Sequence, residues 1–451
     1  MSKAIKLGII GAGSATFSLG LVRDLCCSDV LYGSTIMLMD INEERLNSIH
    51  NLATRYVDEL KIDLKFEKTL SREAALKDAD FVINTALFGG HDQHEAGRAV
   101  GDKHGYYRGA PGMNYNQLRF MLSVAKDMEA ICPDAWLIQS SNPVFDGCTL
   151  MTRKTNTKVV GLCHGHYGYH GIARVLGLDL AHVECQAVGF NHIIYMTHFL
   201  YKGEDAYPLI DEWIETKAEE YWCTHKLGHD AQLSPAAVHQ YKMIGLFPIG
   251  DTPRRGGWWY HINLETKKRW YGEIGGFDSE IGWTQYLDGL AKRVDHIMKV
   301  ANDVSISVTK EFPPHRSGEQ QLGIIEGLAL NKEGKFQVNI PNNGLIKDIP
   351  DDVVVEVPAM VNKTGIHGIQ VGKLPKNLLL QVLWPRMLDM ENNLELALSS
   401  DKRLFLRMIL DDHRTKSLEQ AEAFIEDFLS MPFNREMAEN MAKNAIPPRE
   451  A

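Results

Sequence analysis

The sequence predicts an α/β fold: a doubly wound parallel sheet in the first part of the chain, followed by a second, α+β part. Short apolar runs at residues 5–10, 35–39 and 81–86 alternate with helical segments, as strands and crossover helices do in parallel sheets. Polar residues follow each run, at the edge where such sheets bind ligands. Beyond Leu200 long helical segments surround one β-rich stretch, 334–358.

The length and composition indicate two domains and exclude some classes of partner. A chain of 451 residues exceeds the roughly 250–300 residues at which one core stops growing, so we expect domains at 1–197 and 198–451. The net charge is −10, without a long basic run, which argues against nucleic acid or an anionic membrane as a partner. Seven scattered cysteines, no secretory leader and no apolar run long enough to span a membrane predict a soluble, cytoplasmic protein.

The first strand, 5–10, runs into a glycine-rich turn that opens a helix at 17–25. A glycine at the first position of this turn permits the tight bend, and a second one lets a pyrophosphate approach the amides of the helix N-terminus. The next strand, 35–39, ends in an acidic residue that suits a ribose diol and favours NAD over its 2′-phosphorylated form. We therefore predict a Rossmann-like dinucleotide site formed by Gly11, Gly13, Ser14, Ala15, Thr16 and Asp40.

The following elements continue the alternation. Residues 42–61 have helical periodicity, with Leu46, Ile49 and Leu52 on one face. After the strand at 81–86 we expect a polar loop beginning at Gly89-Gly90, then a helix at about 114–131. The further expected elements are strands at 64–66 and 136–139, a Ser140-Ser141-Asn142-Pro143 loop, and helices at 209–222, 284–302, 376–399 and 415–430.

Two polar clusters near the middle of the chain are candidates for chemistry. Cys163-His164-Gly165-His166 follows the apolar run 159–162, and Gly189-Phe190-Asn191-His192 follows the next one. A cysteine is often an inert core residue, but a continuation of His-Gly-His does not suit a core. A thiolate and an imidazole are ligands for a borderline-soft metal, so we predict Cys163 and His192 as metal ligands. His164 and His166 would contact substrate or support a ligand.

A third candidate region begins near residue 241. Asp251 lies in a Gly-Asp turn, where it is either an ordinary turn residue or a general acid or base. Tyr241 is either a core residue or a phenolic base whose pKa a cation would lower. Arg254 and Arg255 are either a solvated pair or guanidinium groups for an acidic substrate, and the same holds for Arg119.

Together these motifs resemble family 4 of the glycoside hydrolases, enzymes that depend on NAD and a divalent metal and are related in fold to lactate and malate dehydrogenases. The resemblance covers most of the chain, although Ala12 replaces a glycine that is common in the family's turn. The residues that carry it are Gly11-Ala12-Gly13-Ser14, Ser141-Asn142-Pro143-Val144, Cys163-His164-Gly165-His166, Gly189-Phe190-Asn191-His192, Asn339-Ile340-Pro341-Asn342-Asn343-Gly344 and Val354-Val355-Glu356-Val357-Pro358.

The resemblance implies elimination assisted by oxidation rather than displacement by two carboxylates. Sugar C3 is oxidised by NAD, a base removes the C2 proton, a metal (expected to be manganese) stabilises the enediolate, and the aglycone leaves. By resemblance Cys163 and His192 bind the metal and Asp251 is an acid/base group; Tyr241 is a weaker match to the family's tyrosine base. The implied substrate contacts are Asn142 (also near the cofactor), His164, Arg119, Asn191 and Arg254.

The four residues from Cys163 to His166 resemble the α-galacturonidase branch of the family, with α-glucuronidases nearby. They do not resemble the phospho-β-glucosidase branch, which has asparagine after the cysteine. A uronate would give the arginines a carboxylate to bind. The alternatives are a neutral α-glucosidase or α-galactosidase of the family, a plain NAD-dependent hydroxy-acid dehydrogenase, and an NAD-binding sensor. The family also suggests a homodimer or homotetramer.

Overall fold

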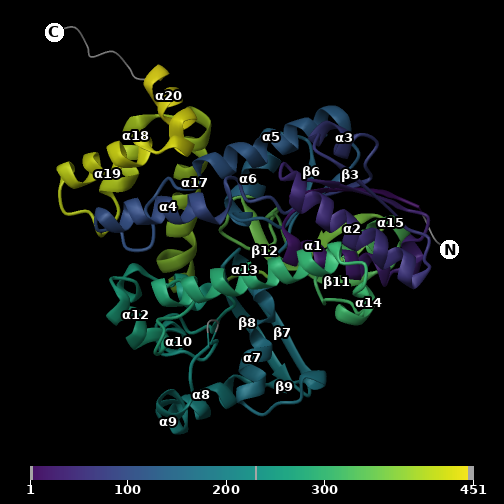
Figure 1. The fold of residues 1–451 in the computed structure, drawn as a ribbon. Coiled ribbons are helices and arrows are strands. Elements are labelled where there is room, and N and C mark those ends of the chain that lie inside the picture. The colour runs from purple at the N-terminus through teal and green to yellow at the C-terminus, as the bar shows by residue number, and fades with distance from the viewer. Residues whose placement is uncertain (1–3, 229–230, 445–451) are drawn as a thin grey trace. The chain divides into compact units, whose positions relative to one another are not determined.

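The computed structural model describes residues 4–228 and 231–444 (Figure 1). The chain divides into two compact units that alternate along the sequence. The first unit comprises Met1–Ala86, Ser123–His164 and Thr284–Lys373, and the second comprises Leu87–Leu122, Gly165–Trp283 and Leu374–Ala451. The predicted domains 1–197 and 198–451 stay a prediction. None of the helices in the described ranges has the length and apolar character needed to cross a bilayer.

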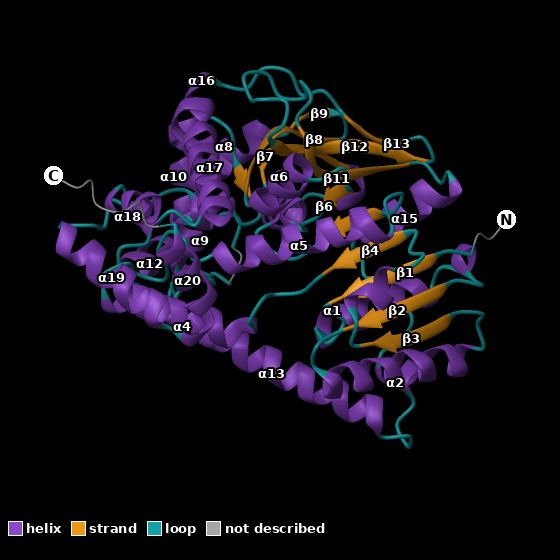
Figure 2. Ribbon diagram, turned by 90° about the horizontal axis from the view of Figure 1, so that it is seen from above, coloured by secondary structure: helices purple, strands orange, loops and turns teal. Residues whose placement is uncertain are grey.

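The first unit contains the predicted parallel sheet. Its strands lie in the order β3-β2-β1-β4-β5-β6, and every neighbouring pair is parallel. This is the strand order of a Rossmann sheet. Successive strands are added on one side of β1 as far as β3, and from β4 onward on its other side. Figure 2 shows β4, β1, β2 and β3 side by side. The bounds are β1 Lys6–Ile10, β2 Thr35–Met39, β3 Lys65–Thr69, β4 Phe81–Asn84, β5 Trp136–Gln139 and β6 Lys158–Gly161.

The predicted β-rich stretch extends this sheet in the antiparallel sense. Strand β11 (Gly334–Pro341) pairs with β6 through Asn339 and Gly161, and with β12 (Val354–Asn362) along its length. Strand β13 (Gly365–Gly368) pairs with β12. The other helices of this unit are α1 Ala15–Cys26, α2 Glu43–Leu60, α3 Arg72–Leu76, α6 Val144–Lys154, α14 Val308–Glu311 and α15 Gln321–Leu330, while α5 Tyr115–Ile131 and α13 Glu280–Asn302 contribute residues to both units.

Local sequence explains why helix α2 forms where it was predicted. The side chain of Asn42 accepts a hydrogen bond from the backbone N of Arg45, which caps the first turn. Leu46, Ile49 and Leu52 repeat at helical spacing and are fully buried. Lys61 ends the helix in the left-handed region.

The second unit is built around an antiparallel hairpin of β7 (Val183–Phe190) and β8 (Ile193–Tyr201), with β10 (Pro248–Ile249) and β9 (Glu204–Asp205) on β8. Its remaining elements are helical, as the sequence predicts beyond Leu200. They are α4 Gly90–Lys103, α7 Gly168–Val175, α8 Tyr207–Thr216, α9 Ala218–Thr224, α10 Pro235–Ile244, α11 Thr252–Arg255, α12 Leu264–Tyr271, α16 Lys376–Leu378 leading through a π-helical turn into α17 Trp384–Ser399, α18 Lys402–Leu410, α19 Leu418–Ser430 and α20 Arg435–Lys443.

The prediction of a polar loop beginning at Gly89-Gly90 is wrong, because residues Gly90–Lys103 form helix α4. The helix has few apolar residues, so no hydrophobic periodicity reveals it in the sequence. Gly89 begins it in the left-handed region, and Arg98 contacts Glu95 one turn earlier at 2.8 Å. The predicted fold class is confirmed: a Rossmann-like parallel sheet accompanied by an α+β part.

Candidate active site

The glycine-rich turn of the first unit requires its glycines. Gly11 has a φ of +87°, and a Cβ there would lie 2.6 Å from the backbone N of Ala86. A Cβ on Gly13 would lie 2.7 Å from Oδ2 of Asp40. The backbone N of Gly13 instead donates a hydrogen bond to that oxygen at 2.7 Å. The turn therefore packs closely against the residues that follow β2 and β4, and its main chain forms a cradle at the start of α1.

The surroundings of this cradle suit a dinucleotide. In the described structure Ser14, the N-cap of α1, makes no side-chain capping bond, so the first amides of the helix can face an anion. Asp40 follows β2, and its Oδ1 also accepts a hydrogen bond from the N of Asn42 at 2.8 Å. These two backbone bonds fix the carboxylate and leave lone pairs for a ribose diol.

Beside the cradle, the carboxyl ends of β4 and β5 carry a buried amide network. Asn84 donates through Nδ2 to Oε1 of Gln139 at 3.0 Å, and Gln139 donates to Oγ of Ser141 at 2.7 Å. The next residue, Asn142, is exposed. The network thus fixes the strand ends and presents the predicted ligand contact Asn142 to solvent.

Cys163 follows β6 in the same unit and is half-buried. The N of Leu162, just before it, donates to the carbonyl of Gln139 at 2.9 Å, which fixes the strand end. His164 is largely exposed, and its Nδ1 lies 3.7 Å from Oε1 of Glu319. Within the described ranges, no group of three or more His, Cys, Asp or Glu side chains forms a metal-binding set.

The second unit brings together His192, Asp251 and Arg254. His192 lies at the tip of the β7–β8 hairpin with a φ of +67°, an uncommon backbone for a residue other than glycine. Its Nε2 lies 3.1 Å from Oδ2 of Asp251. Thr252 holds the two segments together, because its hydroxyl accepts from the N of Ile194 at 2.7 Å and donates to the same residue's carbonyl at 2.9 Å.

Arg254 bridges two carboxylates. Its Nη2 pairs with Oδ1 of Asp251, and its Nη1 donates to Oδ2 of Asp278 at 2.9 Å. Arg108 donates through Nε to the carbonyl of Asp278 at 3.3 Å and lies 3.4 Å from Glu95. Asp251 is therefore held from one side by an imidazole and from the other by a guanidinium.

These contacts set the charge of the cluster. Burial lowers the pKa of His192 to about 4, although Asp251 opposes that shift. Burial would raise the pKa of Asp251, but the charges of His192 and Arg254 lower it by more than burial raises it. Its pKa therefore lies below the ordinary value. At neutral pH the cluster therefore contains a neutral imidazole, able to bind a metal, and an anionic carboxylate, able to accept a proton.

Tyr241 and Arg119 make their contacts elsewhere in the second unit. The hydroxyl of Tyr241 donates to Oδ1 of Asp211 at 2.8 Å, and burial followed by this carboxylate raises the pKa of the phenol. Arg119 donates to the carbonyl of Ala397 at 3.0 Å and lies 3.4 Å from Glu436. Asn191, next to His192, is buried. The predicted roles of these residues stay predictions.

Several residues of the cluster were missed from the sequence. Asp278 follows a Gly275-Gly276 turn and has no local signal that marks it as a partner of Arg254. Lys267 belongs to a helix with charged neighbours, which suggests a solvated side chain, yet it is only 2% exposed. Its Nζ lies 3.1 Å from Nδ1 of His261, and burial lowers the pKa of the amine to about 8.

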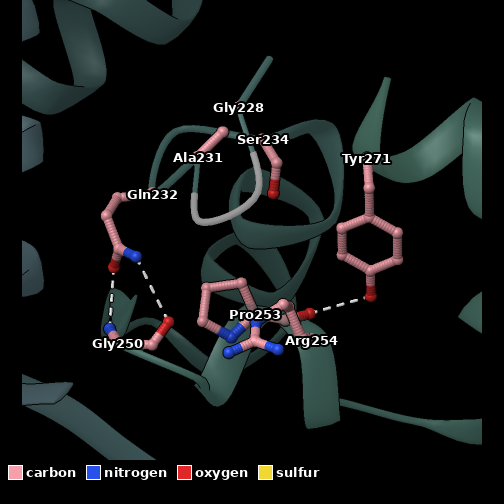
Figure 3. A pocket seen from close by; sticks show the side chains of 8 residues that line it. All are labelled: Gly228, Ala231, Gln232, Ser234, Gly250, Pro253, Arg254 and Tyr271. Atoms are coloured by element: carbon pink, nitrogen blue, oxygen red, sulfur yellow. Dashed lines mark hydrogen bonds between the residues drawn. The ribbon is translucent and has the colours of Figure 1, made fainter. Parts of the chain in front are cut away.

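Hydrogen bonds fix the residues on either side of Asp251, Gly250 and Pro253 (Figure 3). Gln232 accepts from the N of Gly250 at 2.7 Å and donates to its carbonyl at 3.2 Å. The hydroxyl of Tyr271 donates to the carbonyl of Pro253 at 2.9 Å. The cavity that these residues line with Arg254 has a volume of about 10 Å³, enough for a single water molecule and too small for a sugar.

Comparison with known proteins identifies the family of the chain. Residues 6–178 match the model of the family 4 glycosyl hydrolases, and residues 187–415 match that family's C-terminal domain. A probable 6-phospho-β-glucosidase of Bacillus subtilis is 29% identical over 83% of this chain and 84% of its own length. An α-galacturonidase of Lachnoclostridium phytofermentans is 27% identical over 94% of this chain and 95% of its own.

The fold also matches a solved structure, a 6-phospho-α-glucosidase from gut microorganisms in complex with NAD and glucose-6-phosphate. The TM-score is 0.76 at 20% identity, with 96% of this chain and 99% of the other covered. The sequence motifs and the two matched models thus lead to one family. The chain belongs to family 4 of the glycosyl hydrolases and is a glycosidase.

Proposed function

We propose that this glycosidase cleaves α-galacturonides and uses NAD and a divalent metal, expected to be manganese. The observation that carries the proposal is the Asp251 carboxylate, held between His192 and Arg254. A similar α-galacturonidase matches almost the whole chain, whereas the similar phospho-β-glucosidase matches a shorter part of it. The plain dehydrogenase and the NAD sensor are not favoured, because the chain belongs to a family of glycosidases.

Residues of the first unit fit NAD. The main-chain cradle at Gly11 and Gly13, at the start of α1, suits the pyrophosphate, and Asp40 suits the adenosine ribose diol. A solved structure of similar fold contains NAD. The cofactor, when bound, supplies reversible oxidation at sugar C3, which makes the proton on C2 acidic.

The thiol of Cys163 and the imidazole of His192 suit a divalent metal as donors. His192 directs Nε2 toward Asp251, an arrangement common in metal sites, where the second ring nitrogen binds a carboxylate and the first binds the metal. A solved structure of similar fold contains NAD and Mn²⁺. The remaining coordination positions suit water and the sugar hydroxyls.

Asp251 is the stronger candidate for the base that removes the C2 proton. Its pKa lies below the ordinary value, so it is anionic at neutral pH. Tyr241 is less suited, because burial and Asp211 raise its pKa and keep the phenol protonated. Arg254 orients the Asp251 carboxylate and thereby has fewer donors left for substrate.

Arg255 is the candidate for the uronate carboxylate. Arg98, Arg108 and Arg254 have carboxylate partners. Arg255 is exposed, and among residues 4–228 and 231–444 it has no hydrogen bond or ion pair. Its charge acts on both Asp251 and Asp278, so it lies near the cluster. A free planar guanidinium suits a carboxylate, which a neutral hexose lacks.

The test is proton NMR of methyl α-galacturonide digested in heavy water with NAD and manganese. We expect galacturonate that carries deuterium at C2, without net NADH. Arg255→Met is expected to raise KM for the galacturonide and to leave cleavage of methyl α-galactoside unchanged. Cleavage without deuterium would refute the elimination route. Cleavage of glucuronides or neutral α-glycosides in place of galacturonides would refute the proposed substrate but not the family assignment.

A further inference from the structure

A pair of exposed tryptophans follows the arginines of the candidate site. Trp258 and Trp259 are 44% and 39% exposed, although tryptophan is among the more buried side chains on average. Only Gly256 and Gly257 separate them from Arg255. An exposed aromatic pair of this size is typical of a surface that binds a ligand or another protein.

The orientation of both indole rings is fixed. One face of Trp258 stacks on His413, with ring centroids 5.6 Å apart and an interplanar angle of 27°. The ring of Trp259 lies against Tyr260 at 5.3 Å and covers Gly257, where a Cβ would come within 2.5 Å of the ring. The rings are therefore held in place before any ligand arrives, which lowers the entropy that binding would cost.

Contacts within the second unit connect this aromatic pair with the cluster around Asp278. Arg414, the neighbour of the stacked histidine, donates to the carbonyl of Tyr107 at 3.0 Å. Arg108 donates to the carbonyl of Asp278, whose side chain accepts from Arg254. The histidine behind Trp258 is thus adjacent in the chain to Arg414, which binds the residue before Arg108, and Arg108 in turn binds Asp278.

We propose that Trp258 and Trp259 form a subsite for a sugar on the leaving-group side, so that the preferred substrate has at least two sugar rings. The inference rests on the proposed function. The sugar that loses its C2 proton must lie at Asp251. The exposed tryptophans, which follow the Asp251 segment in the chain, then face the leaving group that projects toward solvent. The C–H face of a pyranose ring is apolar and flat, and it matches an exposed indole.

The experiment compares an α-linked digalacturonide with methyl α-galacturonide, measuring kcat/KM for both in the holoenzyme. In Trp258→Ala we expect the ratio of kcat/KM for the two substrates to fall by about 10- to 100-fold, the loss typical of a stacked anchor. Trp258→Phe should restore most of the ratio, because it keeps an aromatic face. Ile262→Ala removes another exposed apolar side chain of the same segment, 50% exposed, and should leave the ratio unchanged.

A second readout does not depend on turnover. In the Asp251→Asn enzyme, saturation-transfer NMR should show contact between the protein and the C–H protons of the leaving-group ring, and Trp258→Ala should remove it. An unchanged ratio together with unchanged saturation transfer would overturn the inference and leave the hydrolase intact. An equal loss for both substrates, with a smaller sedimenting mass, would show that the tryptophans join two copies of the chain and would also overturn it.

If the proposed function is wrong, the result differs from those above: the wild-type enzyme cleaves neither the digalacturonide nor methyl α-galacturonide. Saturation transfer to an α-linked neutral disaccharide such as melibiose, lost in Trp258→Ala, would then still support a leaving-group subsite. The absence of that transfer would overturn the subsite as well.

Discussion

The Nε2 atom of His192 lies 3.1 Å from Oδ2 of Asp251, although the two residues are almost sixty positions apart in the chain. The hairpin tip supplies the imidazole and the segment before α11 supplies the carboxylate. Thr252 joins them through two hydrogen bonds to Ile194. The pair therefore has a fixed geometry, and its neutral imidazole and anionic carboxylate lead to the first prediction.

Asp251→Asn should lower kcat by about 10²- to 10⁴-fold, because an amide cannot accept the C2 proton. The variant should still bind NAD, since its substitution lies in the other unit from the glycine cradle. The measurement is deuterium exchange at C2 together with cofactor binding by calorimetry. Normal C2 exchange in this variant would assign the base to another group, with Tyr241 tested next as Tyr241→Phe.

Gly13→Ala should weaken NAD binding by about 10- to 100-fold, the effect of losing a charge-assisted hydrogen bond. The added Cβ would displace the Asp40 carboxylate, which lies 2.7 Å from that position. Ala12→Gly is the matched control, since it alters the same turn without adding an atom. The prediction fails if calorimetry gives equal NAD affinities for Gly13→Ala and the wild type while both remain folded.

Asp278→Asn should destabilise the protein by about 1–3 kcal/mol, because it removes a carboxylate partner of Arg254 from an ion pair whose side chains are only 12% and 20% exposed. Its carboxylate accepts from Arg254, and the cations Arg254, Arg255 and Lys267 keep its pKa below the ordinary value against the effect of burial. The free energy of unfolding in urea measures the effect. Asp295→Asn, at an exposed position, should be neutral, and equal losses in both variants would contradict the argument.

Glu59 should make the first unit sensitive to acid. Burial would raise its pKa, but hydrogen bonds from Thr309, Ser307 and Val308 lower it to about 2 from the ordinary 4.5. A lowered folded-state pKa contributes stability that is present above the unfolded pKa and is lost as pH falls through the folded one. The free energy of unfolding should therefore decrease between about pH 4.5 and pH 2, in addition to any contribution from other acids.

The control for this acid sensitivity is the same titration with Glu59→Gln, in which that part of the slope should disappear. Glu215→Gln, another surface carboxylate, should keep the wild-type slope. A Glu59→Gln curve that is parallel to the wild type throughout this range would show that the carboxylate does not stabilise the start of α14.

The features that could be predicted from the sequence are those with a local cause. Buried strands and their terminal turns identified the parallel sheet, and Gly11, Gly13 and Asp40 followed from one strand–turn–helix–strand pattern. Helix α4 was missed because its sequence has almost no apolar periodicity. The partnership of Arg254 with Asp278, 24 residues away, and of Asp278 with Arg108, 170 residues away, depends on tertiary packing that no local pattern encodes.

The bond between Gly13 N and Asp40 Oδ2 has a consequence for coenzyme engineering. Besides its proposed contact with the ribose, Asp40 satisfies a backbone donor of the turn that we propose binds the pyrophosphate. Replacing it with a residue that accommodates a 2′-phosphate would leave that amide without its acceptor and loosen the turn itself. A change of coenzyme in this chain therefore requires at least two coordinated substitutions: one to receive the phosphate, and one to hold the loop.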